Sequence, residues 1–433
     1  MRLLIASLPL RRHRPHLTKL THFPLACIKT NPIQPIHHTA SYSSSSSPIP
    51  FSPQTYLHTA RQKFASQPPT LIHDTLSPTP SHLLTLSLAD HVPALFPPGT
   101  STATSTGPRE QERPATLPQG HHLVYFPLQL PPSQLMPDGT DPAHRPGAPI
   151  VLRMWAGGEV VFCEGWDLHL CLYGRAALCV EEVDGPVLKG VEGDEKVFVE
   201  VRRGYGLGGV GREVVVEEVR RLVFMRERVG GVVEGGRVVR AYATPEFTFS
   251  LRPDATLLFH FSALTYNAHS IHIDPDYARN QEGYKGLLVH GPLTLVLMLS
   301  ALRACLAKLS GQPSTGALPE GQSMPYVKSL SYRNLAPLYV NEDMKVCLRR
   351  INTEEIGQLR WDVWIEGPEG GIAVKGSAIT TPASGTPEAW TLINSDCEEA
   401  GERMGGCVRL RKTESFNGWR GPESEFCIRD TQL

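Results

Sequence analysis

Two histidines and two further polar side chains lie close together in the stretch SALTYNAHSIHIDPDYA, between positions 262 and 278. They are Asn267, His269, His272 and Asp274. A histidine whose pKa is near its ordinary value can take up and return a proton at cellular pH. The stretch is therefore a candidate site for acid–base catalysis, and solvated loop histidines are the alternative.

A possible partner for this chemistry follows in LLVHGPLT, residues 287–294. Removal of a proton next to a thioester carbonyl creates an enolate-like oxygen, which needs a hydrogen-bond donor. Gly291 precedes Pro292 and a long apolar run, so its backbone N–H should lie at a helix N-terminus. Glycine also allows a carbonyl group to approach closely.

Three other kinds of site are not predicted. His269, His272 and Asp274 follow H-x-x-H-x-D, but zinc sites on helices prefer histidines four residues apart, and Pro275 disfavours a helix through Asp274. The nucleophile pattern G-x-S-x-G is missing from the sequence. The glycines of GYGLGG, residues 204–209, precede a predicted strand and not a helix, so they predict no dinucleotide cofactor.

The composition limits the class of protein. A chain of 433 residues can form two domains, and a net charge of −1 provides no field for binding nucleic acid. The apolar run 287–302 contains His290, Gly291 and Pro292, which favours a buried helix over a membrane span. Nine scattered cysteines, none in a C-x-x-C pair, indicate reduced thiols and no disulfide framework.

The two ends differ from the rest of the chain. The first fifty residues are basic, rich in serine and free of acidic residues, which predicts a mitochondrial presequence over 1–50. A tail without a targeting role is the alternative. Residues 383–433 lack clear periodicity and are expected to form a poorly ordered extension.

Between these ends the pattern predicts an α+β fold, in which a curved antiparallel sheet wraps a helix with apolar residues all round. Helices are expected over 54–64 and 292–309, with a further apolar segment at 82–95. Strands are expected at 121–130, 196–203, 212–225, 329–332, 344–351, 358–366 and 371–380.

These residues resemble a known family. The MaoC-like hot-dog dehydratases and hydratases carry S-G-D-x-N-P-[IL]-H-x-D-P-x-[YF]-A, which is similar to residues 265–278, and [IV]-V-H-G-x-L-T, which is similar to 288–294. Within this group the chain resembles the mitochondrial type 2 hydroxyacyl-thioester dehydratases and the mesaconyl-CoA-type hydratases. They share MWAGG at 154–158 and SYRNLAPLY at 331–339, and the resemblance spans about Gln54 to Thr380.

The resemblance implies two hot-dog repeats, each an antiparallel sheet wrapped around a central helix. Residues 51–235 would form an N-terminal degenerate repeat and residues 236–382 a C-terminal catalytic repeat. The implied enzyme is a hydro-lyase that reversibly dehydrates (3R)-hydroxyacyl thioesters to trans-2-enoyl thioesters, in fatty acid synthesis in the mitochondrial matrix. Its partner would be an acyl-ACP or acyl-CoA thioester, with no cofactor, metal, nucleic acid or membrane span; a homodimer stays open.

The resemblance also implies the roles of single residues. His272 would be the base, and the Gly291 N–H would bind the thioester oxygen. The family has an aspartate where this chain has Asn267, and an amide cannot transfer a proton. Asn267 would therefore position water or the substrate hydroxyl, and His269 or Asp274 would supply the second proton step.

Substrate-binding residues are predicted as well. The acyl chain would lie along the apolar helix, lined by Leu295, Val296 and Leu299. Arg333 is a candidate for a phosphate of the carrier, with a structural salt bridge as the alternative.

Two other functions remain. A hydratase of a short dicarboxylic acyl-CoA, such as mesaconyl-CoA, would need a cation such as Arg333 or Arg279 near the far end of its substrate. The replacement at Asn267 also allows a binding module for acyl thioesters that has no catalytic activity.

Overall fold

The computed structural model describes residues 51–95, 116–208, 213–226, 239–240, 243–310, 325–351 and 358–381. The predicted presequence and C-terminal extension lie outside these residues. All the elements below belong to one compact unit, Ser52–Leu433.

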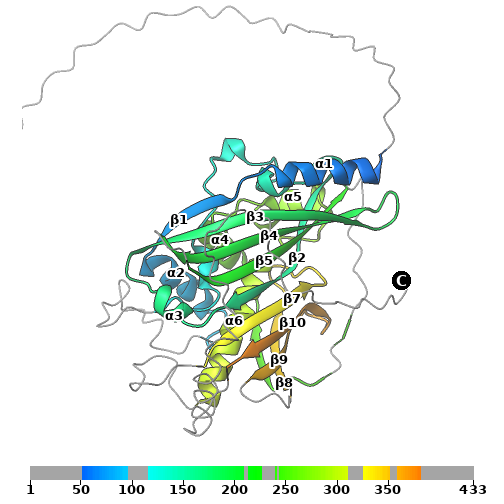
Figure 1. Cartoon of the computed structure of the whole chain (residues 1–433). Coiled ribbons are helices and arrows are strands. Elements are labelled where there is room, and N and C mark those ends of the chain that lie inside the picture. Colours follow the sequence, from blue (N-terminus) through cyan, green and yellow to red (C-terminus); the bar gives the residue numbers. More distant parts are fainter. Residues whose placement is uncertain are drawn as a thin grey trace, which may run out of the picture. The chain divides into compact units, whose positions relative to one another are not determined.

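The strands form one ten-stranded antiparallel sheet in the order β1-β3-β4-β5-β2-β7-β10-β9-β8-β6 (Figure 1). The bounds of the first five strands are β1 Thr70–Leu76, β2 Ile150–Phe162, β3 Arg175–Lys189, β4 Lys196–Leu207 and β5 Val214–Arg226. The bounds of the second five are β6 Phe247–Leu251, β7 Val327–Asn334, β8 Met344–Ile351, β9 Leu359–Glu366 and β10 Ile372–Thr380.

The sheet consists of two halves with the same strand order. We call β1-β3-β4-β5-β2 the first half-sheet and β6-β8-β9-β10-β7 the second half-sheet, because each strand of one has a counterpart in the other at the same place. The halves join where β2 pairs with β7, with Gly157 opposite Arg333 and Val161 opposite Ser329. The two equivalent edges therefore meet in one continuous sheet.

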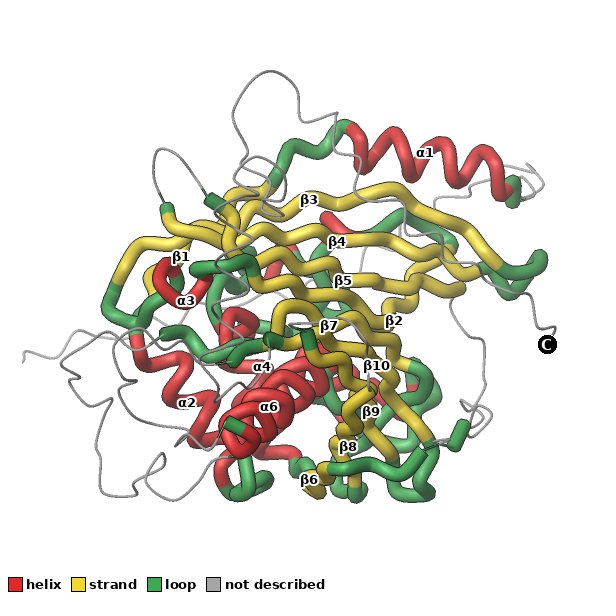
Figure 2. The backbone as a smooth tube through the Cα atoms, turned by 60° about the horizontal axis from the view of Figure 1, so that its bottom comes forward, coloured by secondary structure: helices red, strands yellow, loops and turns green. Residues whose placement is uncertain are grey.

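A long helix, α6, packs against the second half-sheet (Figure 2). It runs from Gly291 to Leu309, with Pro292 in its first turn, where the missing N–H of proline costs little. By length and composition α6 could cross a membrane. Every residue from Leu293 to Leu302 is buried, however, as expected for the core helix of a folded domain.

The other helices are shorter. Their bounds are α1 Pro53–Ala65, α2 Pro78–Ala89, α3 Trp166–His169, α4 Ala255–Thr265 and α5 Pro275–Asn280, with 3₁₀ turns η1 His121–Val124, η2 Pro132–Gln134, η3 Pro142–His144 and η4 Ser270–His272. One apolar cluster joins both half-sheets, and it includes Val160 of β2, Leu297 of α6 and Trp361 of β9.

The predicted α+β class and antiparallel sheet around a central helix are confirmed. Two local predictions were wrong. Residues 121–130, predicted as a strand, form η1 and a loop, because this short apolar run is buried against other elements and does not alternate between two faces. Helix α4 was missed, and the first four residues of the histidine stretch, Ser262–Thr265, are its last turn.

Candidate active site

The histidine loop, which we define as residues 266–274, begins where α4 ends. Tyr266 has a φ of 51°, in the left-handed region, so the chain turns sharply away from the helix. The Asn267 side-chain oxygen accepts a hydrogen bond from the backbone N–H of His269, at 3.1 Å. Asn267 therefore shapes the loop that carries both histidines.

His272 is held in one tautomer. Its Nδ1 lies 2.8 Å from the carbonyl oxygen of Leu288, which can only accept, so Nδ1 carries the hydrogen. The Nε2 lone pair makes no hydrogen bond to any residue that the structure describes. Burial, with the nearby His269 adding to the effect, lowers the pKa of His272 to about 3. The ring is thus neutral at pH 7 and can accept a proton at Nε2.

A third histidine links His272 to the start of α6. The His290 ring stacks on the His272 ring with centroids 3.8 Å apart and an interplanar angle of 22°. His290 is completely buried, and its Nε2 lies 2.8 Å from the Ser262 hydroxyl of α4. His290 is also the N-cap residue of α6, so the stacked pair places His272 beside the N-terminus of that helix.

Gly291 occupies a position where a larger residue does not fit. A Cβ atom there would lie 2.8 Å from Cγ of Trp155 and 3.1 Å from Nδ2 of Asn334. The Gly291 N–H, in the first turn of α6, donates to no acceptor among the described residues. The geometry therefore leaves this donor available for an oxygen that carries negative charge.

Trp155 comes from the first half-sheet and is fixed by several contacts. Its indole N–H donates to the Tyr332 hydroxyl at 3.0 Å, and its carbonyl oxygen accepts from Asn334 at 2.8 Å. The guanidinium of Arg220 lies 5.4 Å from the centre of its ring. MWAGG and SYRNLAPLY, far apart in the sequence, thus meet beside Gly291.

A second segment of the first half of the chain reaches the histidine loop. The backbone N–H of Ser270 donates to the carbonyl of Asp138 at 2.9 Å. Next to it, Gly139 has a φ of +80°, and a Cβ atom there would lie 1.9 Å from the carbonyl oxygen of Ala268. The close approach of these two backbones requires glycine.

The other predicted site residues lie in different surroundings. His269 is buried, with its ring centroid 5.5 Å from that of His272. Asp274 is exposed and caps α5, because its Oδ1 accepts from the N–H groups of Asp276 and Tyr277. Leu295, Val296 and Leu299 are fully buried in the shared core. Arg333 is exposed on β7 and has no ion-pair partner among the described residues.

Sequence reasoning missed several contributors. His290 stood in the quoted HGP motif, and Trp155 and Asn334 stood in the two shared motifs, but no role was predicted for any of them. The shared motifs were the available signal. Their meeting point at Gly291 depends on the pairing of β2 with β7, which the sequence does not show.

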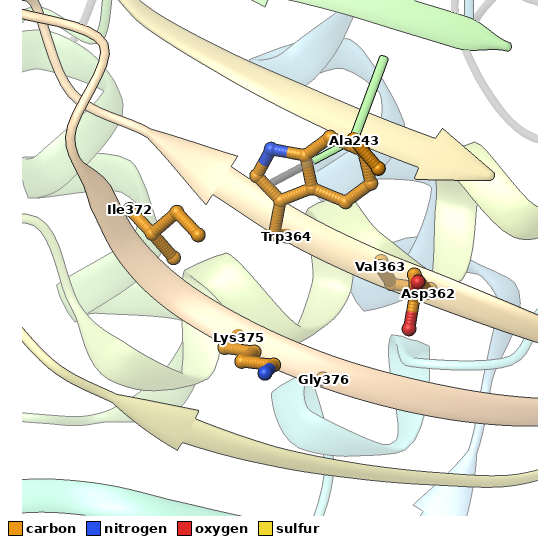
Figure 3. Close-up of a pocket in the computed structure, with 7 residues that line it drawn as sticks. All are labelled: Ala243, Asp362, Val363, Trp364, Ile372, Lys375 and Gly376. Atoms are coloured by element: carbon orange, nitrogen blue, oxygen red, sulfur yellow. The ribbon is translucent and has the colours of Figure 1, made fainter. Parts of the chain in front are cut away.

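Other clusters of the described residues lie away from this centre. Figure 3 shows a depression on β9 and β10, where the Asp362, Trp364 and Lys375 side chains lie on the sheet face that alternates with the core-facing Val363 and Val374. Asp141, His144 and Glu181 are spaced as metal ligands could be. Glu181, however, already binds Arg203 at 2.8 Å and His144 at 2.9 Å, which is a salt-bridge network.

Comparison with known proteins gives consistent matches. Residues 120–340 match the family described as hydroxyacyl-thioester dehydratase type 2. Mesaconyl-C(4)-CoA hydratase of Chloroflexus aurantiacus is 32% identical over 260 residues, which cover 60% of this chain and 81% of the relative. The mitochondrial hydroxyacyl-thioester dehydratase type 2 of Schizosaccharomyces pombe is 24% identical, over 64% of this chain and 89% of the relative. A MaoC-like dehydratase structure from Phytophthora capsici aligns with a TM-score of 0.47 and 18% identity, covering 74% of this chain and 98% of that one.

Proposed function

Because the chain belongs to the hydroxyacyl-thioester dehydratase type 2 family, we propose that it is a hydro-lyase that interconverts (3R)-hydroxyacyl thioesters and trans-2-enoyl thioesters. The observation that carries this proposal is the neutral His272, fixed by Leu288. Among the described residues, neither its Nε2 nor the nearby N–H of Gly291 has a hydrogen-bond partner.

In the dehydration direction His272 Nε2 removes a proton from the carbon next to the thioester carbonyl. The carbonyl oxygen gains negative charge, and the Gly291 N–H and the positive end of the α6 dipole stabilise it. The carbon–oxygen bond at position 3 then breaks. The leaving hydroxyl takes a proton from an imidazole of the site and departs as water.

His269 is better placed than Asp274 for the second proton step. The His269 ring lies beside the His272 ring, whereas Asp274 Oδ1 is committed to the N-terminus of α5. Asn267 acts on the reaction by holding the backbone of His269.

Several finer features complete the proposal. Residues 51–235 and 236–382 form the two repeats, the first without catalytic residues of its own. Leu295, Val296 and Leu299 line the acyl chain, which enters after a local shift of the core. Arg333 lies near the end of the substrate that is joined to the carrier. The substrate is carried by CoA or by acyl carrier protein in the mitochondrial matrix, for fatty acid synthesis, since the S. pombe relative is a mitochondrial protein.

The test measures hydration of crotonyl-CoA through the loss of enoyl-thioester absorbance. The wild type should turn over, and His272→Ala should lower kcat by about 10³-fold, the range for loss of a general base. His58→Ala, on the exposed side of α1, is the matched control and should retain full activity. An active His272→Ala protein with a normal melting temperature would refute the role of His272.

A hydratase of a dicarboxylic acyl-CoA is the second candidate, favoured by the 32% identity to the Chloroflexus relative. The position of Arg153 on β2 also favours this candidate. Its charge lowers the pKa of both His269 and His272, and it has no hydrogen-bond or ion-pair partner among the described residues. A substrate carboxylate could pair with it. A higher kcat/KM for mesaconyl-CoA than for crotonyl-CoA would select this candidate. Binding of both thioesters without turnover would instead support a binding module that has no catalytic activity.

A further inference from the structure

A buried carboxylate lies next to His269. The His269 Nε2 and Glu282 Oε1 atoms are 3.8 Å apart, and the two side chains are only 3% and 2% exposed. Glu282 follows α5, and its backbone N–H donates to the carbonyl of Tyr277. A charged group this deep in a protein is rarely retained without a partner.

The 3.8 Å separation is longer than a hydrogen bond, so Glu282 acts on the tautomer of His269 through its charge. An ionised carboxylate only accepts hydrogen bonds, so it favours a hydrogen on Nε2. Nδ1 is then the basic nitrogen, and it makes no hydrogen bond to the residues that the structure describes. His269 would thus offer a basic nitrogen on a ring whose centroid lies 5.5 Å from that of His272.

We propose that Glu282 is a positioning residue that orients His269 and makes it the second proton-transfer group of the site. This inference rests on the proposed hydratase–dehydratase function. In hydration, His269 Nδ1 takes a proton from water, the water oxygen forms the bond to carbon 3, and protonated His272 gives its Nε2 proton to carbon 2. In dehydration both protons move the opposite way, and the two rings then exchange one proton through solvent.

Glu282 also makes the charged state of His269 accessible. Burial, followed by the charge of Arg153, lowers the pKa of His269 to about 3, which opposes formation of an imidazolium. A carboxylate close to the ring favours the imidazolium that forms when water loses its proton. Asn267, at the position of the family's aspartate, carries no charge and cannot do this.

A second carboxylate, Asp138, also acts on His269, and its charge raises the pKa of that ring. Asp138 also faces His269, with Arg145 behind it, but the Asp138 carboxylate accepts from the Thr140 N–H, the Thr140 hydroxyl and Arg145. Tyr277 hydrogen-bonds to Glu282 from the other side; burial first, and then Glu282, raise its pKa. A structural role for Glu282 would act through its other contacts, of which the hydrogen bond with Tyr277 can be tested directly.

A double-mutant cycle on purified full-length protein separates these roles. Glu282→Gln and His269→Gln should each lower kcat for crotonyl-CoA hydration by about 10²-fold, with little change in KM. The Glu282→Gln/His269→Gln double variant should be no slower than either single variant, because the pair acts as a unit. Glu282→Asp keeps the carboxylate and should recover activity to within about tenfold of wild type.

Two further variants control for structural effects. Tyr277→Phe removes one further partner of Glu282 and should stay within about threefold of wild type, and Glu246→Gln, at an exposed ion pair with Arg350, should match wild type. Losses that multiply in the double variant, or a Tyr277→Phe protein as slow as Glu282→Gln, would overturn the positioning role. An inactive wild type would instead refute the proposed function itself, and this inference with it.

Discussion

The two half-sheets share one strand order but have very different interiors. The second half-sheet encloses α6, whose residues from Leu293 to Leu302 are all buried. Among the described residues, the 12-residue α2 and the 3₁₀ turn η1 contribute to the apolar cluster next to the first half-sheet, and charged residues are also buried in this half. The buried polar network of the first half consists of His122, Glu181, Arg203, Tyr205, Glu218 and Arg220.

Glu218 is the centre of this network. It binds Arg220 through both carboxylate oxygens at 2.9 Å, accepts from the Tyr205 hydroxyl, and lies 3.8 Å from His122. Burial alone would raise the pKa of Glu218, but Arg220 and His122 outweigh it and lower that pKa. Arg220 in turn lies over Trp155, which contacts Gly291. One half therefore carries the proposed catalytic residues, and the buried polar network of the other half packs against them through Trp155.

The largest effect is expected from the buried polar network around Glu218. Glu218→Gln leaves Arg220 buried without its carboxylate, and loss of one partner of a buried ion pair costs about 3 kcal/mol or more. The melting temperature should fall by roughly 5–10 °C, while kcat at 20 °C changes by less than about threefold. Glu200→Gln, at a half-exposed pair with Arg202 and Arg221, is the matched control and should cost less than about 1 kcal/mol. A large loss of kcat with an unchanged melting temperature would place Glu218 in the chemistry.

The second-largest effect is expected at Gly291, which lies in the half that carries the proposed catalytic residues. Gly291→Ala should lower kcat by about 10²-fold, because the new methyl collides with Trp155 and moves the N–H donor. The melting temperature should fall less than in Glu218→Gln, because the shift of Trp155 costs stability while alanine is the better helix former. Gly286→Ala, in the same connection but with no atom within 4 Å of a built Cβ, is the control. If both variants are fully active, the donor is not at Gly291.

The smallest effect for a single residue is expected from protonation of the buried histidines in the two halves, which lowers the free energy of unfolding. Burial lowers the pKa of His122 to about 4, those of His269 and His272 to about 3, and those of His121 and His290 well below 6.5. The unfolded chain binds these protons near pH 6.5 and the folded chain does not. Each histidine therefore removes about 1.4 kcal/mol of stability for each pH unit below 6.5, until its folded pKa is reached.

Urea denaturation between pH 8 and pH 5 measures this loss. Activity should disappear together with the near-ultraviolet circular dichroism signal as the pH falls. If activity instead disappears near pH 6 while that signal persists, a catalytic histidine titrates in the folded protein near its ordinary pKa.

The sequence predicted the second half better than the first. Strands β8 and β9 and helix α6 were predicted to within one residue, because their apolar residues recur with clear periods and glycines mark the turns. The run at 121–130 fails this rule, since tertiary packing buries it on all sides. His272 and Gly291 were predicted as site residues from local motifs. Glu282 was not, because the low exposure of its side chain, 2%, is a property of the folded chain, and a lone glutamate in a loop normally faces water.

The junction of β2 with β7 has a consequence for biosynthesis. Gly157 of β2 can pair with Arg333 of β7 only after Arg333, 176 residues further along the chain, has left the ribosome. Until then the nascent chain carries β2 with an unpaired row of backbone N–H and C=O groups, which other chains could add to. Contacts so distant in sequence also slow folding. The enzyme should therefore depend on chaperones during synthesis, and its two halves, expressed as separate fragments, should aggregate.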